Sequence, residues 1–305
     1  MTDGEISVGG ITVRLTRTGK QLFGGNGISK GDLIEYYLTI APRILPYLRE
    51  RPLAMRRYPD GIAGQAIVQK NVPRTFPDWI TRVEVEKQGG TVCQVVCDKP
   101  ATLVYLANQA SIELHVFLSQ LGALDRPDQL VFDLDPADAG QFGQACRTAL
   151  ALRRLLTDEL GLAAYVKTTG GKGLHVHVPL RAEEHFDSVR AFARQAADLL
   201  ASRDPGRLTT EQRRQERDGR LYLDVMRNAY AQLAIAPYSA RGRPGAPVAT
   251  PLHWDEVEDG GPAPGQLTIR TTAARLARIA DPWAGMTRHR RGLAGPRRRL
   301  DALSR

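Results

Sequence analysis

Two aspartates stand two residues apart in an otherwise apolar stretch, QLVFDLDP at 129–136. Side chains alternate across a β-strand, so Asp133 and Asp135 point to one face while the apolar residues beside them point to the other. Two carboxylates this close repel each other, and each loses hydration if the strand is buried. We therefore expect positive charge between them.

A third acidic residue, Asp224, occurs in a second strand-like stretch, RLYLDVMRN. If the two strands are neighbours, Asp224 joins the first two carboxylates, and hard oxygen ligands of this kind suit Mg²⁺ or Mn²⁺. Two such ions can hold the attacking and leaving oxygens of a phosphoryl transfer. The alternative is that each carboxylate caps a helix or pairs with an arginine, because the DxD pattern is short and frequent.

A glycine turn between two strand-like stretches, KTTGGKGLHVHV, carries the opposite charge. It has neither the P-loop spacing nor GxGxxG, but its glycines can expose backbone N–H groups to a phosphate, and Lys172 adds a cation. His175 and His177 share one face of the following strand. By themselves they could be a metal-binding pair or ordinary core or surface histidines. For His175, which follows this basic turn, we favour contact with a phosphate.

Basic residues elsewhere in the chain favour a polyanionic partner. Arg241 and Arg243 in PYSARGRPG carry guanidinium groups that suit polyphosphate oxygens, with solvated surface arginines as the alternative. The net charge is +9, with basic patches at 213–217 and 288–299, which suits nucleic acid or is simply a basic surface. An acidic metal site beside a basic triphosphate site is what a nucleotidyl transferase requires.

The composition is that of a globular protein, with 42% hydrophobic and 25% charged residues among 305. The chain has no run of eighteen apolar residues and no signal-peptide pattern, so we expect a cytoplasmic, nucleoid-associated protein without a membrane partner. Its cysteines, Cys93, Cys97 and Cys146, are too few for a disulfide framework and lack a second pair for zinc, so we expect buried free thiols.

The elements that position these groups follow from apolar periodicity and turn residues. We expect a helix at 31–48, capped by Ser29 and broken or kinked by Pro42 and Pro46. Further helices are expected at 101–121, which carries His115, and at 140–160 and 184–203. We expect β-rich structure over 51–104 and strands at 130–135, 164–169, 174–180, 221–226 and 233–238. This order predicts a mixed α/β sheet with helices packed on it.

The motifs resemble the polymerase domain of bacterial ligase D, a member of the archaeo-eukaryotic primase-polymerase superfamily. The matching segments span about 10–285 and are LVFDLDP, KTTGGKGLHVHVPL, LYLDVMRN and IAPYSARGRPGAPVATPLHW, with ISKGDLIEYY and SIELHVF. The resemblance implies an α/β (α+β) primase-polymerase core with an RRM-like mixed sheet and flanking helices. It implies one domain over 1–290, with a β-rich part at about 1–100, a catalytic core at about 101–285, and a basic tail at 291–305.

The same resemblance implies roles for individual residues. Asp133, Asp135 and Asp224 would be catalytic and would ligate two Mn²⁺ or Mg²⁺ ions. The incoming NTP or dNTP would be bound by His115, Thr169, Lys172, His175 and Arg241. A 5′-phosphate on the downstream DNA strand would be bound by Arg17, Lys20 and Lys30.

Two departures from the family pattern concern DNA. Ile67 and Val68 stand where the family has an aromatic pair that stacks on the template, a contact worth about 1–3 kcal/mol per base. Arg17 replaces the asparagine expected in the 5′-phosphate pocket, which adds charge and changes geometry. We therefore expect polymerisation to follow the family more closely than gap recognition does.

The implied function is a DNA-repair polymerase that adds ribo- or deoxynucleotides to broken, gapped or overhanging DNA in non-homologous end joining. Ku and a separate ATP-dependent DNA ligase are the expected partners, because no ligase or nuclease module follows before Arg305. Gap filling in excision repair is the alternative pathway, and a non-catalytic module that bridges DNA ends is the alternative class. A haloacid-dehalogenase phosphatase would carry its DxD near the chain start, whereas here the motif lies mid-chain before Pro136.

Overall fold

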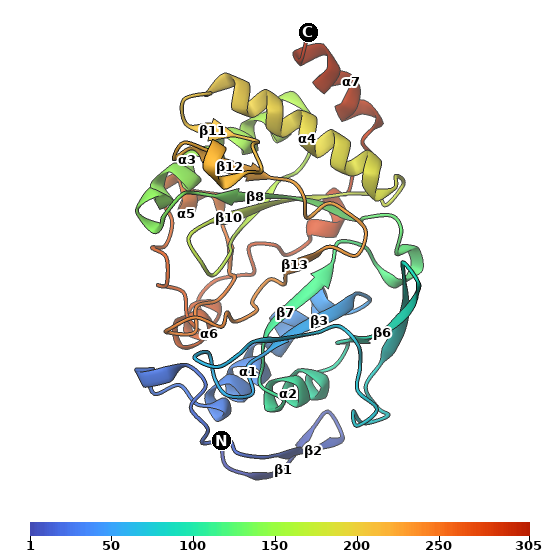
Figure 1. The fold of residues 1–305 in the computed structure, drawn as a ribbon, viewed down its shortest axis with the longest axis vertical. Coiled ribbons are helices and arrows are strands. Elements are labelled where there is room, and N and C mark those ends of the chain that lie inside the picture. The colour runs from blue at the N-terminus through green and yellow to red at the C-terminus, as the bar shows by residue number, and fades with distance from the viewer. The chain divides into compact units, whose positions relative to one another are not determined.

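The computed structural model describes the backbone of residues 1–305 and every side chain except that of Asn26 (Figure 1). Its contacts divide the chain into two compact units. Unit 1 comprises Met1–Phe117, Leu233–Thr250 and Gly265–Ile279, and unit 2 comprises Leu118–Gln232, Pro251–Pro264 and Ala280–Arg305. Each unit is therefore assembled from segments that are far apart in the sequence.

Unit 1 is built on an antiparallel sheet. Its strand order is β13 (Leu233–Ile235), β7 (Ser111–Phe117), β3 (Pro52–Arg57), β6 (Gly90–Val96) and β5 (Arg82–Lys87), and β4 (Ile67–Gln69) also pairs with β3. The remaining elements are β1 (Gly4–Val8) paired with β2 (Ile11–Leu15), the 3₁₀ turn Gly24–Asn26, and the helices α1 (Lys30–Leu48), α2 (Pro100–Asn108) and α6 (Ile269–Leu276). The predicted β-rich N-terminal part is confirmed.

Helix α1 begins as predicted and does not break. The Ser29 hydroxyl accepts a hydrogen bond from the Asp32 N–H at 3.2 Å, and the Asp32 carboxylate accepts one from the Ser29 N–H at 2.7 Å, which forms a capping box. Pro42 and Pro46 lie inside one continuous helix, so the break that we gave as one alternative is wrong, and the kink stays a prediction. Tertiary packing of the apolar face, with residues such as Ile40 fully buried, maintains the helix despite the lost N–H donors.

The predicted helix over 101–121 is also wrong beyond its first half. Helix α2 ends at Asn108, Ala110 adopts a left-handed φ of 56°, and the chain continues as strand β7, which carries His115. Strand β7 pairs with β3 on one side and β13 on the other and is buried along almost its whole length. A strand buried on both faces shows no alternation, so its apolar run cannot be told from a buried helix by periodicity.

Unit 2 contains the predicted mixed sheet. Its order is β11 (Leu208–Thr209), β12 (Leu221–Asp224), β8 (Gln129–Asp135), β10 (Leu174–Pro179), β9 (Tyr165–Thr168) and β14 (Pro251–Leu252). Only the β11–β12 pair is parallel. Four of the five expected strands lie in this sheet, where β12 ends earlier than predicted, whereas the fifth, β13, also ends earlier and belongs to the sheet of unit 1. A mixed α/β architecture is thereby confirmed.

Unit 2 contains the two helices predicted at 140–160 and 184–203 and two further helices that were not predicted. They are α3 (Phe142–Arg154), which continues as a π-helical turn at Leu155–Glu159, α4 (Phe186–Arg203), α5 (Trp254–Glu258) and α7 (Ala294–Leu303). Short 3₁₀ turns occur at Leu121–Ala123, Ala139–Gln141, Arg214–Glu216 and Met286–His289. The basic C-terminal segment is ordered as α7, because Leu300 is fully buried and Arg297 donates to the Glu184 carboxylate on unit 2 at 2.7 Å.

Two further expectations from composition can be compared with the structure. All three cysteines are free thiols, with Cys97 and Cys146 buried and Cys93 half-buried. None of the helices that the structure describes has both the length and the apolar character needed to cross a membrane.

Candidate active site

Strand register places two of the three predicted carboxylates side by side. Strand β12 pairs antiparallel with β8 so that Asp224 lies opposite Asp133 and Tyr222 lies opposite Asp135. Directly opposite residues in such a pair have Cβ atoms about 4.5–5.5 Å apart. The expected neighbouring of the two acidic strands is therefore confirmed, whereas the catalytic role of the carboxylates stays a prediction.

The same rung of the sheet continues through two more strands. His175 in β10 lies opposite Asp133 on its other side, and Lys167 in β9 lies opposite His175. The His175 Nε2 is 3.4 Å from an Asp133 carboxylate oxygen, and the side chains of His175 and Asp133 are 4% and 15% exposed. Residues on one rung share a sheet face. Asp224, Asp133, His175 and Lys167 thus form a row across four strands, which we call the acidic row.

Charges along the acidic row separate the protonation states of its members. Burial by itself would raise the pKa of Asp133, but the His175, Arg227 and Lys167 charges lower this pKa to about 2. Burial, followed by the Lys167 charge, lowers the pKa of His175 to about 4. At neutral pH Asp133 is therefore a carboxylate and His175 is neutral. Burial raises the pKa of Asp224, and the Asp133 charge adds to the rise, although the Met226 N–H opposes it.

Basic side chains lie beside each of the two carboxylates, on Asp135 and on Asp133 separately. The Lys172 Nζ lies 3.1 Å and an Arg217 guanidinium nitrogen 3.6 Å from the two oxygens of Asp135, and the Arg227 Nε lies 3.8 Å from Asp133. Among the residues that the structure describes, no three His, Cys, Asp or Glu side chains are arranged as a ready metal-binding group. Asp133 and Asp224, two opposed like charges with hard oxygens, still have the donor chemistry that a divalent cation needs. The ligand role of Asp135 stays a prediction.

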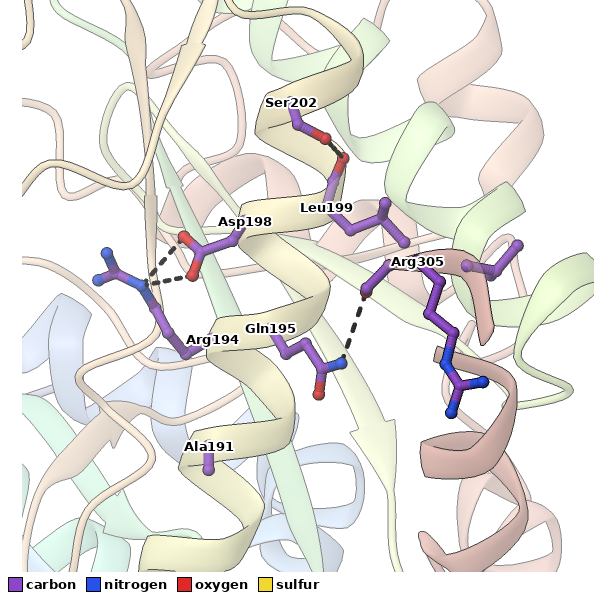
Figure 2. Close-up of a pocket in the computed structure, with 9 residues that line it drawn as sticks. Ala191, Arg194, Gln195, Asp198, Leu199, Ser202 and Arg305 are labelled. Atoms are coloured by element: carbon purple, nitrogen blue, oxygen red, sulfur yellow. Dashed lines mark hydrogen bonds and ion pairs between the residues drawn. The ribbon is translucent and has the colours of Figure 1, made fainter. Parts of the chain in front are cut away.

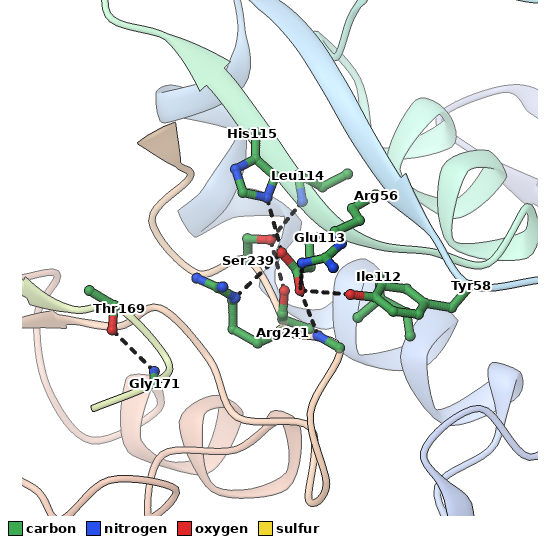
Figure 3. Close-up of polar contacts among 12 residues, drawn as sticks. Arg56, Tyr58, Ile112, Glu113, Leu114, His115, Thr169, Gly171, Ser239 and Arg241 are labelled. Carbon is green, nitrogen blue, oxygen red and sulfur yellow. Dashed lines mark hydrogen bonds and ion pairs between the residues drawn. The ribbon is translucent and has the colours of Figure 1, made fainter. Parts of the chain in front are cut away.

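The glycine turn is shaped by close backbone packing. A Cβ on Gly173 would lie 2.3 Å from the Leu134 carbonyl oxygen, so only glycine fits there, beside the strand that carries the aspartates. The Thr169 N–H donates to the Gly173 carbonyl at 3.0 Å, and the Thr169 hydroxyl accepts from the Gly171 N–H at 3.2 Å, a bond visible in Figure 3. The turn therefore holds Lys172 against Asp135 and against the carbonyl oxygens of Pro136 and Ala137.

A basic cavity adjoins this turn. It has a volume of about 200 Å³ and is lined by Lys172, Arg214, Arg217 and Arg220, with Asp135, Pro136, Ala137 and Gly219. Four cations around one carboxylate suit the oxygens of a phosphate chain. The cavity is therefore suited to an anionic ligand.

A larger open groove in unit 2, about 620 Å³, lies between α4 and the chain end (Figure 2). Its polar side chains pair with one another. The Arg194 Nε donates to both oxygens of Asp198 at 3.1 and 3.0 Å, and the Gln195 amide donates to the Ser304 hydroxyl at 3.5 Å. None of the predicted site residues lines it. The groove is therefore not a candidate active site.

Two other predicted residues, His115 and Arg241, meet in unit 1 at a carboxylate that the sequence did not reveal (Figure 3). Glu113 of β7 is buried and lies 3.0 Å from the His115 Nε2 and 3.4 Å from the Arg241 Nε. It also accepts hydrogen bonds from the Tyr58 hydroxyl at 3.1 Å and the Gly242 N–H at 3.0 Å. A strand assignment for SIELHVF would have placed Glu113 and His115 on one face, but that segment was predicted as helix.

The predicted 5′-phosphate residues are also brought together in unit 1. The Lys30 N–H donates to the Lys20 carbonyl at 2.8 Å, and the Lys20 N–H donates to the Arg17 carbonyl at 3.0 Å. The Lys30 ammonium is buried and donates to the Asn108 carbonyl at 3.0 Å, and this burial lowers its pKa. Arg17 is exposed, and Lys20 is half-exposed and lies 3.2 Å from Asp60. Their binding to DNA stays a prediction.

Comparison with known proteins gives consistent similarities. A family model described as the primase-polymerase domain of LigD matches residues 29–283. The multifunctional non-homologous end joining protein LigD of Mycolicibacterium smegmatis is 35% identical over 249 residues, covering 81% of this chain and 32% of that protein. The bifunctional non-homologous end joining protein LigD of Bacillus subtilis is 33% identical over 272 residues, covering 89% of this chain and 43% of that protein.

A solved structure is similar over nearly the same length. The polymerase domain from Mycobacterium tuberculosis ligase D, in complex with DNA, has a TM-score of 0.84 and 30% identity, covering 90% of this chain and 98% of that one. By contrast, this chain spans only 32% to 43% of the length of the two curated relatives named above. The similarity therefore concerns the polymerase part of those larger proteins.

Proposed function

Because this chain belongs to the LigD primase-polymerase domain family, we propose that it extends DNA 3′ ends by nucleotidyl transfer during the repair of broken or gapped DNA. Membership of that family makes it a nucleotidyltransferase of the polymerase type. The observation that carries the proposal is the acidic row, in which Asp224 lies opposite Asp133 beside a cavity lined by four basic side chains.

The family implies a divalent metal ion and a nucleotide substrate in general. We propose that Asp133, Asp135 and Asp224 hold two such ions, Mn²⁺ or Mg²⁺, since carboxylate oxygens suit both. The chemistry such ions supply when bound is activation of a primer 3′-hydroxyl and neutralisation of charge on the departing pyrophosphate.

The chain's own residues have separate tasks in this proposal. Lys172, with Arg214 and Arg220 in the same cavity, binds the oxygens of the nucleotide's phosphate chain. For His175 we propose a role through Asp133 in place of the phosphate contact expected from the sequence, because its side chain is almost fully buried and its Nε2 faces that carboxylate. Its neutral ring orients Asp133 without cancelling the negative charge. Positioning and charge stabilisation are thus the protein's contribution.

The remaining assignments follow from family membership and stay predictions. Thr169, His115 and Arg241 are proposed nucleotide-binding residues, and Arg17, Lys20 and Lys30 are proposed to bind a 5′-phosphate. Non-homologous end joining is the proposed pathway, because the relatives carry that name, with Ku and a separate ligase as proposed partners. Use of ribonucleotides as well as deoxynucleotides is proposed from the family resemblance.

Primer extension on a gapped duplex, with Mn²⁺ and either ribo- or deoxynucleotides, tests this function. We expect the wild type and an Asp187→Asn control, which changes an exposed carboxylate on α4, to extend the primer. Asp133→Asn is expected to stop extension while DNA binding, which depends on phosphate contacts and on salt, persists. Extension by Asp133→Asn at the wild-type rate would refute the assignment, and DNA binding without any extension by the wild type would favour an end-bridging module.

A further inference from the structure

The pairing of β12 with β8 stops at Asp224, and a side chain takes the place of the missing strand. The register pairs Tyr222 with Asp135 and Asp224 with Asp133, so a longer β12 would bring its next hydrogen-bonded residue opposite Val131. Instead, the Asn228 side chain occupies that position. Its Oδ1 accepts from the Val131 N–H at 2.8 Å, and its Nδ2 donates to the Val131 carbonyl at 2.7 Å.

The same amide also closes the turn that follows Asp224. Its Nδ2 donates to the Val225 carbonyl at 2.8 Å, and the Asn228 backbone N–H donates to that carbonyl at 3.1 Å. Within this turn the Met226 N–H donates to the Asp224 carboxylate at 2.7 Å. Asn228 and Val131 are both fully buried, so water cannot replace these bonds. The Asn228 amide therefore links the backbone two residues before Asp133 to the backbone one residue after Asp224.

We infer that Asn228 is a positioning residue of the active site: its amide acts as a substitute strand that holds Asp133 opposite Asp224. This inference rests on the proposed function, in which these two carboxylates share divalent cations. Without the clamp, the end of β12 can slide or peel away from β8, which separates the two carboxylates. Partners that orient metal ligands typically contribute about 10- to 100-fold to metal affinity.

The chain offers a matched control in Asn108, at the end of α2. The Asn108 side chain accepts from the Thr16 N–H at 3.1 Å and donates to the Arg14 carbonyl at 3.0 Å, so it clamps a strand end in the same way. It is buried as well, but it belongs to unit 1 and has no bond to the acidic row. Loss of either amide removes a buried clamp, and only loss of Asn228 is expected to disturb the carboxylates.

The test measures Mn²⁺ binding directly by electron paramagnetic resonance, together with thermal unfolding, on the full chain. We expect Asn228→Ala to weaken Mn²⁺ binding by about tenfold or more and Asn108→Ala to leave the Mn²⁺ Kd near the wild-type value. Asn228→Ser is the second variant, in case Asn228→Ala does not fold. Its hydroxyl can still bond the Val225 carbonyl locally but is too short to reach Val131, so we expect the same loss of Mn²⁺ affinity.

The outcomes separate this inference from the proposed function. If Asp133→Asn abolishes Mn²⁺ binding while the folded Asn228 variants bind as tightly as Asn108→Ala, the positioning role is overturned and the metal site stands. If the wild type binds no Mn²⁺, or Asp133→Asn binds it unchanged, both are overturned. A selective loss in the Asn228 variants supports the inference, and primer extension at rising Mn²⁺ concentration should then rescue their rate.

Discussion

Glu113 in unit 1 and Asp133 in unit 2 are carboxylates on an inner strand of a sheet, the first buried and the second 15% exposed, and an arginine lies beside each. Their other neighbours differ. Glu113 also accepts from the Tyr58 hydroxyl and the Gly242 N–H, so its oxygens are satisfied by the unit that contains it. Asp133 lies opposite a second carboxylate, Asp224, whose pKa is raised partly by it. The first arrangement anchors a loop, and the second has the paired carboxylates for the divalent cation that we propose there.

The largest expected effect comes from neutralising the carboxylate in unit 2. Asp133→Asn should lower primer extension by at least about a hundredfold, because charge stabilisation in a preorganised site is lost. Its free energy of unfolding should fall by only about 2 kcal/mol, because the surrounding charges lower the pKa of Asp133 from 3.8 to about 2 and the substitution removes that favourable interaction. Extension rates and urea unfolding on the same preparations check this. A large loss of stability would mean that Asp133 anchors the fold as Glu113 does.

The corresponding substitution in unit 1 should lower the free energy of unfolding more than Asp133→Asn does. Glu113→Gln leaves Arg241 and Arg56 without their buried counter-charge and should lower the free energy of unfolding by about 3–5 kcal/mol. Urea unfolding measures the change, with Glu84→Gln on the exposed face of β5 as the control. If Glu113→Gln and the Glu84→Gln control have the same free energy of unfolding, the Glu113 cluster is not an anchor.

Acid should affect the Glu113 anchor in a defined window. Burial by itself would raise the pKa of Glu113, but His115, Arg241 and the Gly242 N–H lower it from 4.5 to about 2. A group whose pKa is lowered by folding adds stability above its unfolded pKa and loses it as the pH falls through the folded value. We expect about 3 kcal/mol of stability to be lost between about pH 5 and pH 2. Urea unfolding across this range should give a shallower dependence for Glu113→Gln.

Binding of divalent ions should change the free energy of unfolding by less than loss of the Glu113 carboxylate does. This change should depend on residues of unit 2 alone. Mn²⁺ at about 100 times its Kd should stabilise the wild type by about 2.7 kcal/mol, because it binds only the folded chain. Chelation should reverse the gain and stop extension. Thermal unfolding with and without Mn²⁺ provides the measurement. The gain should be absent in Asp133→Asn and retained by the Glu84→Gln control, and a gain in all three would place the ions elsewhere.

Ile67 and Val68 depart from the family pattern, and only the structure shows whether their side chains are exposed. Both side chains are exposed, 47% and 64%, on the short strand β4, which pairs only with β3. Exposed apolar residues on an edge strand are available for contact with a partner. The sequence predicted the loss of aromatic stacking there, and the exposure is consistent with an aliphatic surface at the same place.

The sequence by itself determined what depends on neighbours along the chain. Asp133 and Asp135 share a face because side chains alternate along a strand, and Ser29 caps α1 because its hydroxyl and the Asp32 carboxylate are three residues apart. The mixed sheet followed from the order of apolar runs and turns. These features need only local geometry, which the sequence encodes directly.

Tertiary structure decided what depends on register and on packing. Only pairing of β12 with β8 places Asp224 opposite Asp133, and only folding brings the Asn228 amide to Val131, 97 residues away. The segment around His115, predicted as a helix, is strand β7, because it pairs with a neighbouring strand on each side. Local periodicity carries no information about which distant strand will satisfy a backbone N–H, because that choice is made by burial and hydrogen bonding across the whole sheet.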